Sequence, residues 1–334
     1  MSLRVGINGF GRIGRNVLRA SLLRGNKNIV AINAPGDSKT LAHLFKYDSC
    51  YGVYQGDVQF DEKSITIDGQ RIAITREREP ENIPWNESNV NLVVESTGKF
   101  RDESAKKHLG NGVEKIIITA PAKAEDVTIV MGVNEEDYDY NNHNIISNAS
   151  CTTNCLAPVA MIIDKHFGIK KGMMTTIHAS TNDQHILDKR HSDLRRARAA
   201  GESIIPTSTG ASKAVGKVLP ALQGKLDGVS MRVPIPTVSV VDVVFELEKD
   251  CTVEEVNKLF SDYANTSLKG ILEYTDQPLV SVDFKMNPNS AIVDGLSTML
   301  LKGNLLKVIA WYDNEWGYSN RVIDLYEYAT KKNN

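Results

Sequence analysis

The chain has 334 residues, more than a single hydrophobic core usually supports, so we expect two domains. Apolar residues make up 41% and charged residues 24%, the composition of an ordinary soluble protein. The net charge of -2 argues against nucleic acid or an anionic membrane as the main partner, and no segment reaches the roughly 18 apolar residues of a membrane span. Four cysteines are too few for a disulfide framework and no leader-like apolar run opens the chain, so we predict a cytoplasmic protein.

The N-terminal segment reads as strand, glycine turn, helix and strand. Residues 3–7 form an apolar β-like run, the glycines Gly9, Gly11 and Gly14 follow, and apolar residues then recur at helical spacing. A second apolar run at 29–32 completes a βαβ unit. A GxGxxG match alone is weak, but in this context the glycines allow a tight turn and let pyrophosphate approach the helix N-terminus. The pattern predicts a dinucleotide site.

Further apolar runs at 92–94, 116–118 and 129–130 alternate with helical or loop segments. This alternation predicts a doubly wound, mostly parallel Rossmann sheet over residues 1–150. The stretch 59–75, which alternates and carries Asp68-Gly69, is typical of an inserted hairpin.

After residue 150 the pattern changes. We expect β runs at 173–177, 229–233, 238–247, 296–301 and 307–311, a long basic loop over 181–201, and helices over 252–263 and 317–331. Few βαβ repeats occur here, so residues 151–315 should form an α+β domain with a largely antiparallel sheet and helices on one face.

Cys151 is the candidate nucleophile. The Ser- and Asn-rich run 147–150 before it is typical of a helix N-cap, and free N–H groups in the first turn would stabilise a thiolate. A buried packing role is the alternative, and we favour it for Cys50, Cys155 and Cys251. Cys155 shares a helical face with Cys151, but no further Cys/His cluster completes a metal site.

His178 ends a strand beside a polar loop and is the best candidate for the base that serves Cys151. A thiolate together with a nicotinamide cofactor suggests aldehyde oxidation: a thiohemiacetal forms, hydride leaves, and a thioester passes to water or phosphate. Arg196, Arg232 and the hydroxyl-rich runs 150–152 and 207–210 offer donors for an oxyanion or phosphate. The run 193–198 could equally be a solvated loop or a subunit contact.

Six segments together closely resemble the phosphorylating glyceraldehyde-3-phosphate dehydrogenases, across essentially the whole chain. They are residues 6–15, 147–155, His178 with 181–184, 206–210, 231–234 and 311–318. The resemblance implies a homotetramer, oxidation of glyceraldehyde 3-phosphate with inorganic phosphate, and a C-terminal helix 316–334 that returns to the Rossmann domain.

The resemblance also implies residue roles. Cys151 would be the nucleophile and His178 the base, with Thr181 and Arg232 on the substrate's phosphate. The proposed inorganic-phosphate residues are Ser150, Thr152, Arg196, Thr209 and Gly210. The proposed cofactor residues are Gly9, Gly11, Arg12, Ile13, Gly14, Arg78, Thr119 and Asn314, the last of which would orient the nicotinamide.

Three other functions remain open at this point. A cysteine hydrolase would leave the glycine motif without a role, and a nucleotide- or RNA-binding module would leave Cys151 and His178 without one. An erythrose-4-phosphate dehydrogenase is the nearest alternative within the dehydrogenases.

The chain departs from the family pattern at the adenosine end of the cofactor site. An acidic residue about 20 positions past the glycine motif normally binds the ribose of NAD, and Ala34 stands there instead. Lys189 and Arg190 replace an apolar residue and a proline in a loop that, in the family, faces the adenosine of a neighbouring subunit. These changes predict a preference for NADP over NAD. The counter-hypothesis is that Asp37 supplies the carboxylate and that both cations point to solvent.

Overall fold

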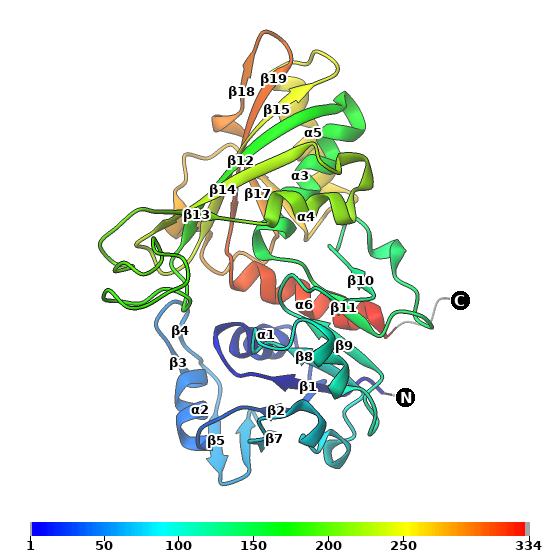
Figure 1. Cartoon of the computed structure of the whole chain (residues 1–334), viewed down its shortest axis with the longest axis vertical. Coiled ribbons are helices and arrows are strands. Elements are labelled where there is room, and N and C mark those ends of the chain that lie inside the picture. Colours follow the sequence, from blue (N-terminus) through cyan, green and yellow to red (C-terminus); the bar gives the residue numbers. More distant parts are fainter. Residues whose placement is uncertain (1, 331–334) are drawn as a thin grey trace. The chain divides into compact units, whose positions relative to one another are not determined.

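The computed structural model describes residues 2–330 and divides the chain into two compact units (Figure 1). The first unit contains the residues up to 129, 135–149 and the residues from 319 on. The second unit contains 130–134 and 150–318. Within residues 2–330, no helix has both the length and the apolarity needed to cross a membrane.

The first unit is built on a nine-stranded sheet whose strands run parallel from β10 to β7 and antiparallel from β7 to β5. The predicted doubly wound, mostly parallel sheet is therefore confirmed. Its inner strands are buried on both faces, as parallel strands covered by helices are. The order is β10 (Val127–Thr128), β11 (Ile145–Ser147), β9 (Lys115–Ile118), β8 (Leu92–Glu95), β1 (Val5–Asn8), β2 (Ile29–Asn33), β7 (Gln70–Thr75), β6 (Ser64–Ile67) and β5 (Val58–Asp61).

Three α-helices accompany this sheet: α1 (Arg12–Leu23), α2 (Ser38–Lys46) and α6 (Trp316–Ala329), the last shown in red in Figure 1. The C-terminal part of α6 bonds to α1, since Ser21 Oγ lies 3.0 Å from Tyr326 Oη and Arg24 donates to Asp324 at 2.7 Å. The remaining short elements are β3 (Tyr47–Asp48), β4 (Gly52–Val53) and 3₁₀ turns η1 (Pro80–Asn82), η2 (Trp85–Ser88), η3 (Glu103–His108) and η4 (Glu135–Asp137).

The second unit is built on an eight-stranded sheet that is mainly antiparallel, as predicted, with parallel pairing only between β12 and β14 and between β16 and β17. The order is β13 (Ile205–Ser208), β14 (Leu226–Val233), β12 (Ile169–Ala179), β15 (Ser239–Leu247), β19 (Leu305–Tyr312), β17 (Ala291–Asp294) and β16 (Leu272–Thr275), with β18 (Met299–Leu301) paired to β19.

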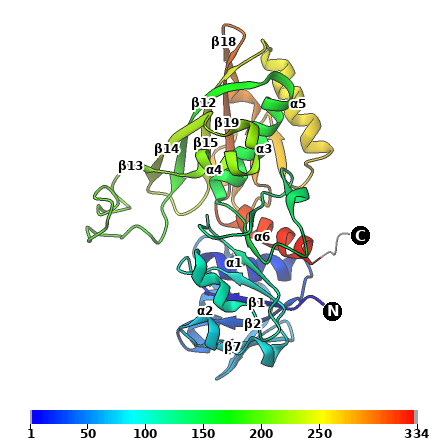
Figure 2. The same ribbon diagram turned by 45° about the vertical axis from the view of Figure 1, so that its right-hand side comes forward.

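Helices α3 (Cys151–Phe167), α4 (Ala211–Val218) and α5 (Val253–Asn265) lie on one side of this sheet (Figure 2). Helix α5 begins with a capping box in which Thr252 and Glu255 satisfy each other's backbone N–H groups. Three short 3₁₀ turns complete the unit: η5 (Pro220–Leu222), η6 (Ser281–Phe284) and η7 (Gly295–Ser297).

Several local predictions need correction. The expected strand at 129–130 lies at Val127–Thr128, and the expected strand at 296–301 is a 3₁₀ turn followed by β18. Helices α2 and α4 and strands β13, β16 and β17 were not predicted, because short elements carry too few apolar repeats to show a period. The hairpin over 59–75 is confirmed, with Asp68 and Gly69 both at positive φ in the turn.

Candidate active site

Cys151 is the first residue of α3, as its polar approach predicted. Ser150 is the N-cap, and its hydroxyl oxygen accepts a hydrogen bond from the N–H of Thr153 at 3.0 Å. Because the first N–H groups of a helix have no intrahelical acceptor, the thiol of Cys151 stands at the positive end of a 17-residue helix.

His178 lies within reach of this thiol. Its Nε2 is 3.5 Å from Cys151 Sγ, and its Nδ1 is 2.7 Å from the carbonyl oxygen of Ala179. A carbonyl can only accept, so it favours the tautomer with a proton on Nδ1, which leaves a lone pair on Nε2 facing the sulfur.

Arg232 competes with that carbonyl for the same ring nitrogen. The pairing of β12 with β14 places Arg232 opposite His178, and its Nη1 lies 2.5 Å from His178 Nδ1 and donates to the carbonyl oxygen of Ala179 at 3.2 Å. A guanidinium can only donate, so this contact favours the opposite tautomer. An anion that drew Arg232 away from the ring would leave Nδ1 to donate to the carbonyl and Nε2 free to accept from the thiol.

The protonation states differ from the thiolate expected for Cys151. Burial raises the pKa of the Cys151 thiol, although the positive charge of Arg232 acts in the opposite direction. Burial and the charge of Arg232 lower the pKa of His178 to about 3. Both shifts favour the neutral forms, a thiol beside an unprotonated imidazole. His178 is thus unprotonated near pH 7, and burial and the charge of Arg232 also make it a weak base.

Of the three other cysteines, Cys155 and Cys251 are buried, in keeping with a packing role, whereas Cys50 is half-buried. Cys155 belongs to the same helix and is fully buried, and its thiol contacts the carbonyl oxygen of Ala310. Cys50 and Cys251 form no disulfide. Within residues 2–330, no group of three or more His, Cys, Asp or Glu side chains is placed to hold a metal ion.

Arg232 has an unused donor beside the catalytic pair. Its Nε is buried and has no hydrogen-bond partner among the described residues. A buried donor without an acceptor is costly, and a bound anion would remove that cost. This guanidinium nitrogen is therefore available to an anion next to Cys151 and His178.

Arg196 belongs to a neighbouring polar cluster formed by the 181–201 loop and β13. It donates to Thr207 Oγ1 at 2.9 Å and to Asp183 at 2.6 Å, while Thr207 donates to Asp193. The guanidinium is thereby held in place with two carboxylates near it. Neither Asp183 nor Asp193 was given a role from the sequence.

The remaining residues predicted to bind phosphate also lie in the second unit, and they differ in burial and in their hydrogen bonds. Gly210 is the N-cap of α4 and provides no side-chain cap, while the hydroxyl of Thr209 accepts from the N–H of Ala211 at 3.2 Å. The N–H of Thr181 donates to Gln184 at 3.4 Å, and Thr181 is half-buried. Thr152 is buried, and its hydroxyl lies 2.8 Å from Tyr312 Oη.

Two residues without a predicted role position the catalytic groups. Tyr312 Oη lies 2.8 Å from the hydroxyls of both Thr152 and Thr176, and its ring packs edge-on against His178. Ser239 Oγ accepts from the N–H of Ala179 at 3.0 Å and donates to Asn314 Oδ1 at 2.9 Å. Tyr312 stands within a recognised motif, whereas nothing local in the sequence singles out Ser239.

The first unit contains a pocket of about 1040 Å³ at the carboxyl ends of its central strands. Gly9, Gly11, Ala34 and Arg78 line it, together with Asn8, Phe10, Asn33, Pro35, Gly36, Thr40, Leu41, Leu44, Arg76, Glu77, Glu79, Ser96, Thr97, Lys99 and Phe100. In a parallel sheet this edge is where ligands bind.

The three motif glycines are required for different reasons. Gly9 has φ +93°, and a Cβ there would lie 2.8 Å from the N of Thr97. A Cβ on Gly14 would lie 2.1 Å from the carbonyl oxygen of Gly9, so Gly14 permits the close approach of α1 to the turn. A Cβ on Gly11 would meet nothing within 4 Å, which leaves free space at the N-terminus of α1 where a pyrophosphate would sit.

The other predicted cofactor residues are more scattered. Arg12 forms an ion pair with Asp48, so its side chain is turned to β3, and Ile13 is half-buried beside it. Thr119 donates to the carbonyl oxygen of Glu95 at 3.1 Å. None of these three lines the pocket. The side chains of Lys189 and Arg190 are exposed in the 181–201 loop of the second unit, and buried Asn314 also belongs to that unit.

Comparison with known proteins places both units in one family. Residues 3–103 match the family description "Glyceraldehyde 3-phosphate dehydrogenase, NAD binding domain" and residues 150–314 match "Glyceraldehyde 3-phosphate dehydrogenase, C-terminal domain". The chain is similar to glyceraldehyde-3-phosphate dehydrogenase 1 of Bacillus cereus, with 58% identity over 98% of this chain and 99% of the relative.

Two further relatives agree. The chain is 57% identical to glyceraldehyde-3-phosphate dehydrogenase of Geobacillus stearothermophilus, over 99% of both chains. It is 54% identical to glyceraldehyde-3-phosphate dehydrogenase 2 of Bacillus subtilis (strain 168), over 99% of this chain and 98% of the relative. With both domains matched and the whole length covered, the chain belongs to the glyceraldehyde 3-phosphate dehydrogenase family.

Proposed function

We propose that this protein oxidises glyceraldehyde 3-phosphate, with inorganic phosphate and a nicotinamide dinucleotide, to 1,3-bisphosphoglycerate, reversibly, in glycolysis or gluconeogenesis. The observation that carries the proposal is the 3.5 Å contact between Cys151 Sγ and His178 Nε2 beside the orphaned nitrogen of Arg232. The names of the relatives give no support to the erythrose 4-phosphate alternative.

Each catalytic residue has a defined part in this reaction. Cys151 attacks the aldehyde carbon while His178 Nε2 takes the thiol proton and passes it to the carbonyl oxygen, which gives a thiohemiacetal. His178 then holds the proton of the hemiacetal hydroxyl as hydride departs, and a thioester remains on Cys151. The nicotinamide ring, when bound, accepts that hydride. Phosphate attacks the thioester and releases the acyl phosphate and Cys151.

The two phosphates would bind to different groups of the second unit. We assign the substrate's own phosphate to Arg232 and Thr181, because the guanidinium of Arg232 contacts His178 and keeps one nitrogen without a partner. We assign inorganic phosphate to the Arg196 cluster and the start of α4, with Ser150, Thr152, Thr209 and Gly210 as the remaining members.

Spectrophotometry tests the reaction directly. Absorbance of the reduced cofactor should rise only when glyceraldehyde 3-phosphate and phosphate are both present. A cysteine hydrolase would turn over without a cofactor, and a nucleotide-binding module would bind the cofactor without turnover. Absence of cofactor reduction would contradict the proposal.

Replacing Arg232 with alanine should weaken binding of glyceraldehyde 3-phosphate and leave unphosphorylated glyceraldehyde nearly unaffected. A charge-assisted hydrogen bond of about 1.5–3 kcal/mol corresponds to a roughly ten- to hundredfold rise in KM. Steady-state kinetics with the two aldehydes measure the difference. Equal losses for both would make Arg232 a support for His178 only.

The cofactor is a nicotinamide dinucleotide, NAD or NADP, and we propose that NADP is preferred. Ala34 and Arg78 line the pocket, so no carboxylate stands at position 34 to repel an extra ribose phosphate. The carboxylate of Asp37 accepts from the N–H of Thr40 at 2.8 Å and from its hydroxyl at 3.0 Å, as the N-cap of α2. This engagement argues against Asp37 as a substitute ribose ligand.

The wild-type kcat/KM with NADP should exceed that with NAD by roughly ten- to a hundredfold, the effect of one charged hydrogen bond to the extra phosphate. The triple variant Ala34→Asp, Lys189→Leu, Arg190→Pro should shift the ratio toward NAD. The single variant Ala34→Asp separates the effect of position 34 on the cofactor preference from the effect of Lys189 and Arg190 in the 181–201 loop. Equal or higher efficiency with NAD in the wild type would contradict the preference.

We also propose a cytoplasmic homotetramer in which residues 1–150 with 316–334 bind the cofactor and residues 151–315 carry out catalysis. Several large apolar side chains of the second sheet are exposed in the single chain: Met173, Val229, Met299, Leu301 and Leu305. A group of exposed apolar side chains commonly marks a protein–protein interface, which supports assembly. Light scattering on the purified protein measures the oligomeric state.

A further inference from the structure

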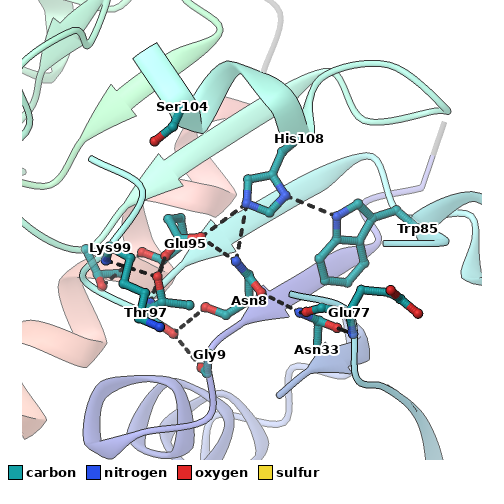
Figure 3. Close-up of polar contacts among 12 residues, drawn as sticks. Asn8, Gly9, Asn33, Glu77, Trp85, Glu95, Thr97, Lys99, Ser104 and His108 are labelled. Atoms are coloured by element: carbon teal, nitrogen blue, oxygen red, sulfur yellow. Dashed lines mark hydrogen bonds and ion pairs between the residues drawn. The ribbon is translucent and has the colours of Figure 1, made fainter. Parts of the chain in front are cut away.

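A buried row of polar side chains crosses the first unit (Figure 3). It runs from Trp85 through His108, Glu95 and Asn8 to Asn33. All five side chains are at most 4% exposed. Glu95, Asn8 and Asn33 end the adjacent strands β8, β1 and β2, so the row follows the edge of the sheet where the pocket lies.

Glu95 is the acceptor at the centre of this row. Its Oε1 accepts from the N–H and the hydroxyl of Thr97, and its Oε2 accepts from Asn8 Nδ2 at 2.6 Å and faces His108 Nε2 at 3.1 Å. Trp85 Nε1 lies 3.3 Å from His108 Nδ1. Because an indole N–H can only donate, His108 Nδ1 must accept, and the proton of the neutral ring is on Nε2. Four donors therefore point at one carboxylate.

These donors determine which end of the Asn8 and Asn33 side-chain amides is the NH₂ group and which is the oxygen. The NH₂ group of Asn8 must face Glu95, so its Oδ1 faces Asn33 and accepts from Asn33 Nδ2 at 2.8 Å. Asn33 Oδ1 then accepts from the N–H of Glu77 at 2.9 Å and from the hydroxyl of Thr75, while Asn33 Nδ2 also donates to the carbonyl oxygen of Glu77. The side chain of Asn33 thus bonds to both the N–H and the carbonyl oxygen of Glu77.

Only the Asn8 and Asn33 part of the row lines the pocket, whereas Glu95, His108 and Trp85 do not. Asn8, Asn33, Thr97 and Glu77 are lining residues, and Glu77 stands between Arg76 and Arg78. Arg76 in turn donates to the carbonyl oxygen of Gly36, two positions after Ala34. The loops that meet the adenosine half of a dinucleotide are therefore tied to the acceptor at Glu95.

We infer that Glu95 and His108 are a buried positioning pair that sets the hydrogen-bond polarity of the adenosine end of the cofactor pocket. The inference rests on the proposed function, since it concerns affinity for the same cofactor. Glu95 acts through Asn8 and Asn33 and touches neither substrate nor cofactor. It therefore contributes to dinucleotide affinity independently of position 34.

Glu95→Gln is nearly isosteric and tests this polarity. If the glutamine NH₂ group took the place of Oε1, it would face the backbone N–H of Thr97, another donor, and that N–H cannot reorient. An NH₂ group at Oε2 would force Asn8 and then Asn33 to flip, which places the Asn33 NH₂ against the N–H of Glu77. The Kd for NADPH and for NADH, measured by fluorescence titration, should rise about tenfold or more. KM for glyceraldehyde 3-phosphate and the alkylation rate of Cys151 should stay unchanged.

The double variant Asn8→Asp, Glu95→Gln moves the carboxylate one position along the row. The new amide at position 95 can then donate to the new carboxylate at position 8 and still accept from Thr97, while that carboxylate accepts from Asn33. His108 Nε2 lies 3.4 Å from the side-chain atom of residue 8 that would accept its proton. The double variant should bind both cofactors within about threefold of wild type, a coupling that a double-mutant cycle quantifies.

Lys115→Met is the matched control for lost stability. Lys115 is buried in the same unit and donates to His143 O and Asn144 Oδ1, away from the pocket. Its loss should lower Tm without changing the Kd for NADPH. A Glu95→Gln variant with wild-type Kd would overturn the inference, as would a double variant that misfolds or stays tenfold weak. If Glu95→Gln alone misfolds, the double variant decides. Failure of the wild type itself to reduce cofactor would overturn the proposed function instead.

Discussion

Replacing Cys151 with alanine should reduce phosphate-dependent cofactor reduction by roughly 10⁴-fold or more, because no thiohemiacetal can form without the sulfur. Cys151 is the first residue of α3, and its thiol is the only one in contact with His178 among the described residues. Steady-state rates and fluorescence titration of the cofactor measure the two consequences. Turnover should be lost, and cofactor affinity should be retained.

Cys155→Ala is the control for this variant. Cys155 lies on the same helix, is fully buried and contacts a backbone carbonyl, so its loss affects packing rather than chemistry. We expect a lower Tm with turnover close to wild type. A Cys151→Ala enzyme with more than trace turnover would contradict the covalent mechanism.

Replacing His178 with asparagine should lower turnover by about 10²–10⁴-fold, the usual effect of losing a general acid–base group. Asparagine can still donate a hydrogen bond to the carbonyl oxygen of Ala179, but it cannot take a proton at the Nε2 position. KM for the aldehyde should change less than kcat, since Arg232 keeps its own bond to that carbonyl.

The pH dependence of Cys151 alkylation separates the contribution of His178 from that of the helix. Burial raises the pKa of the thiol, so the wild-type rate should rise with pH through the neutral range without a plateau near pH 7. His178 has its pKa lowered to about 3, so it stays neutral across that range. The His178→Asn profile should shift to higher pH. An unchanged profile would mean that the helix start alone activates the thiol.

Local patterns in the chain were sufficient for much of the fold and for the catalytic cysteine. Period-two and helical repeats predicted both sheets, and the glycines predicted the turn at Gly9, because these features depend on neighbours within one or two turns of chain. The N-cap chemistry before Cys151 likewise needs only Ser150 and Thr153, which are close in sequence. The shorter elements α2, α4, β16 and β17 were missed because eight or nine residues of helix, or four of strand, give too few repeats.

Tertiary structure decided everything that depends on distant segments meeting. The raised pKa of Cys151 follows from burial, which depends on the packing of distant segments and cannot be inferred from flanking residues. Ser239 joins Ala179 to Asn314 only because β15 pairs with both β12 and β19. Glu95 reads in the sequence as a charged residue after an apolar strand. It gains its four donors because β1, β8 and η3 bring Asn8, Thr97 and His108 around one buried carboxylate.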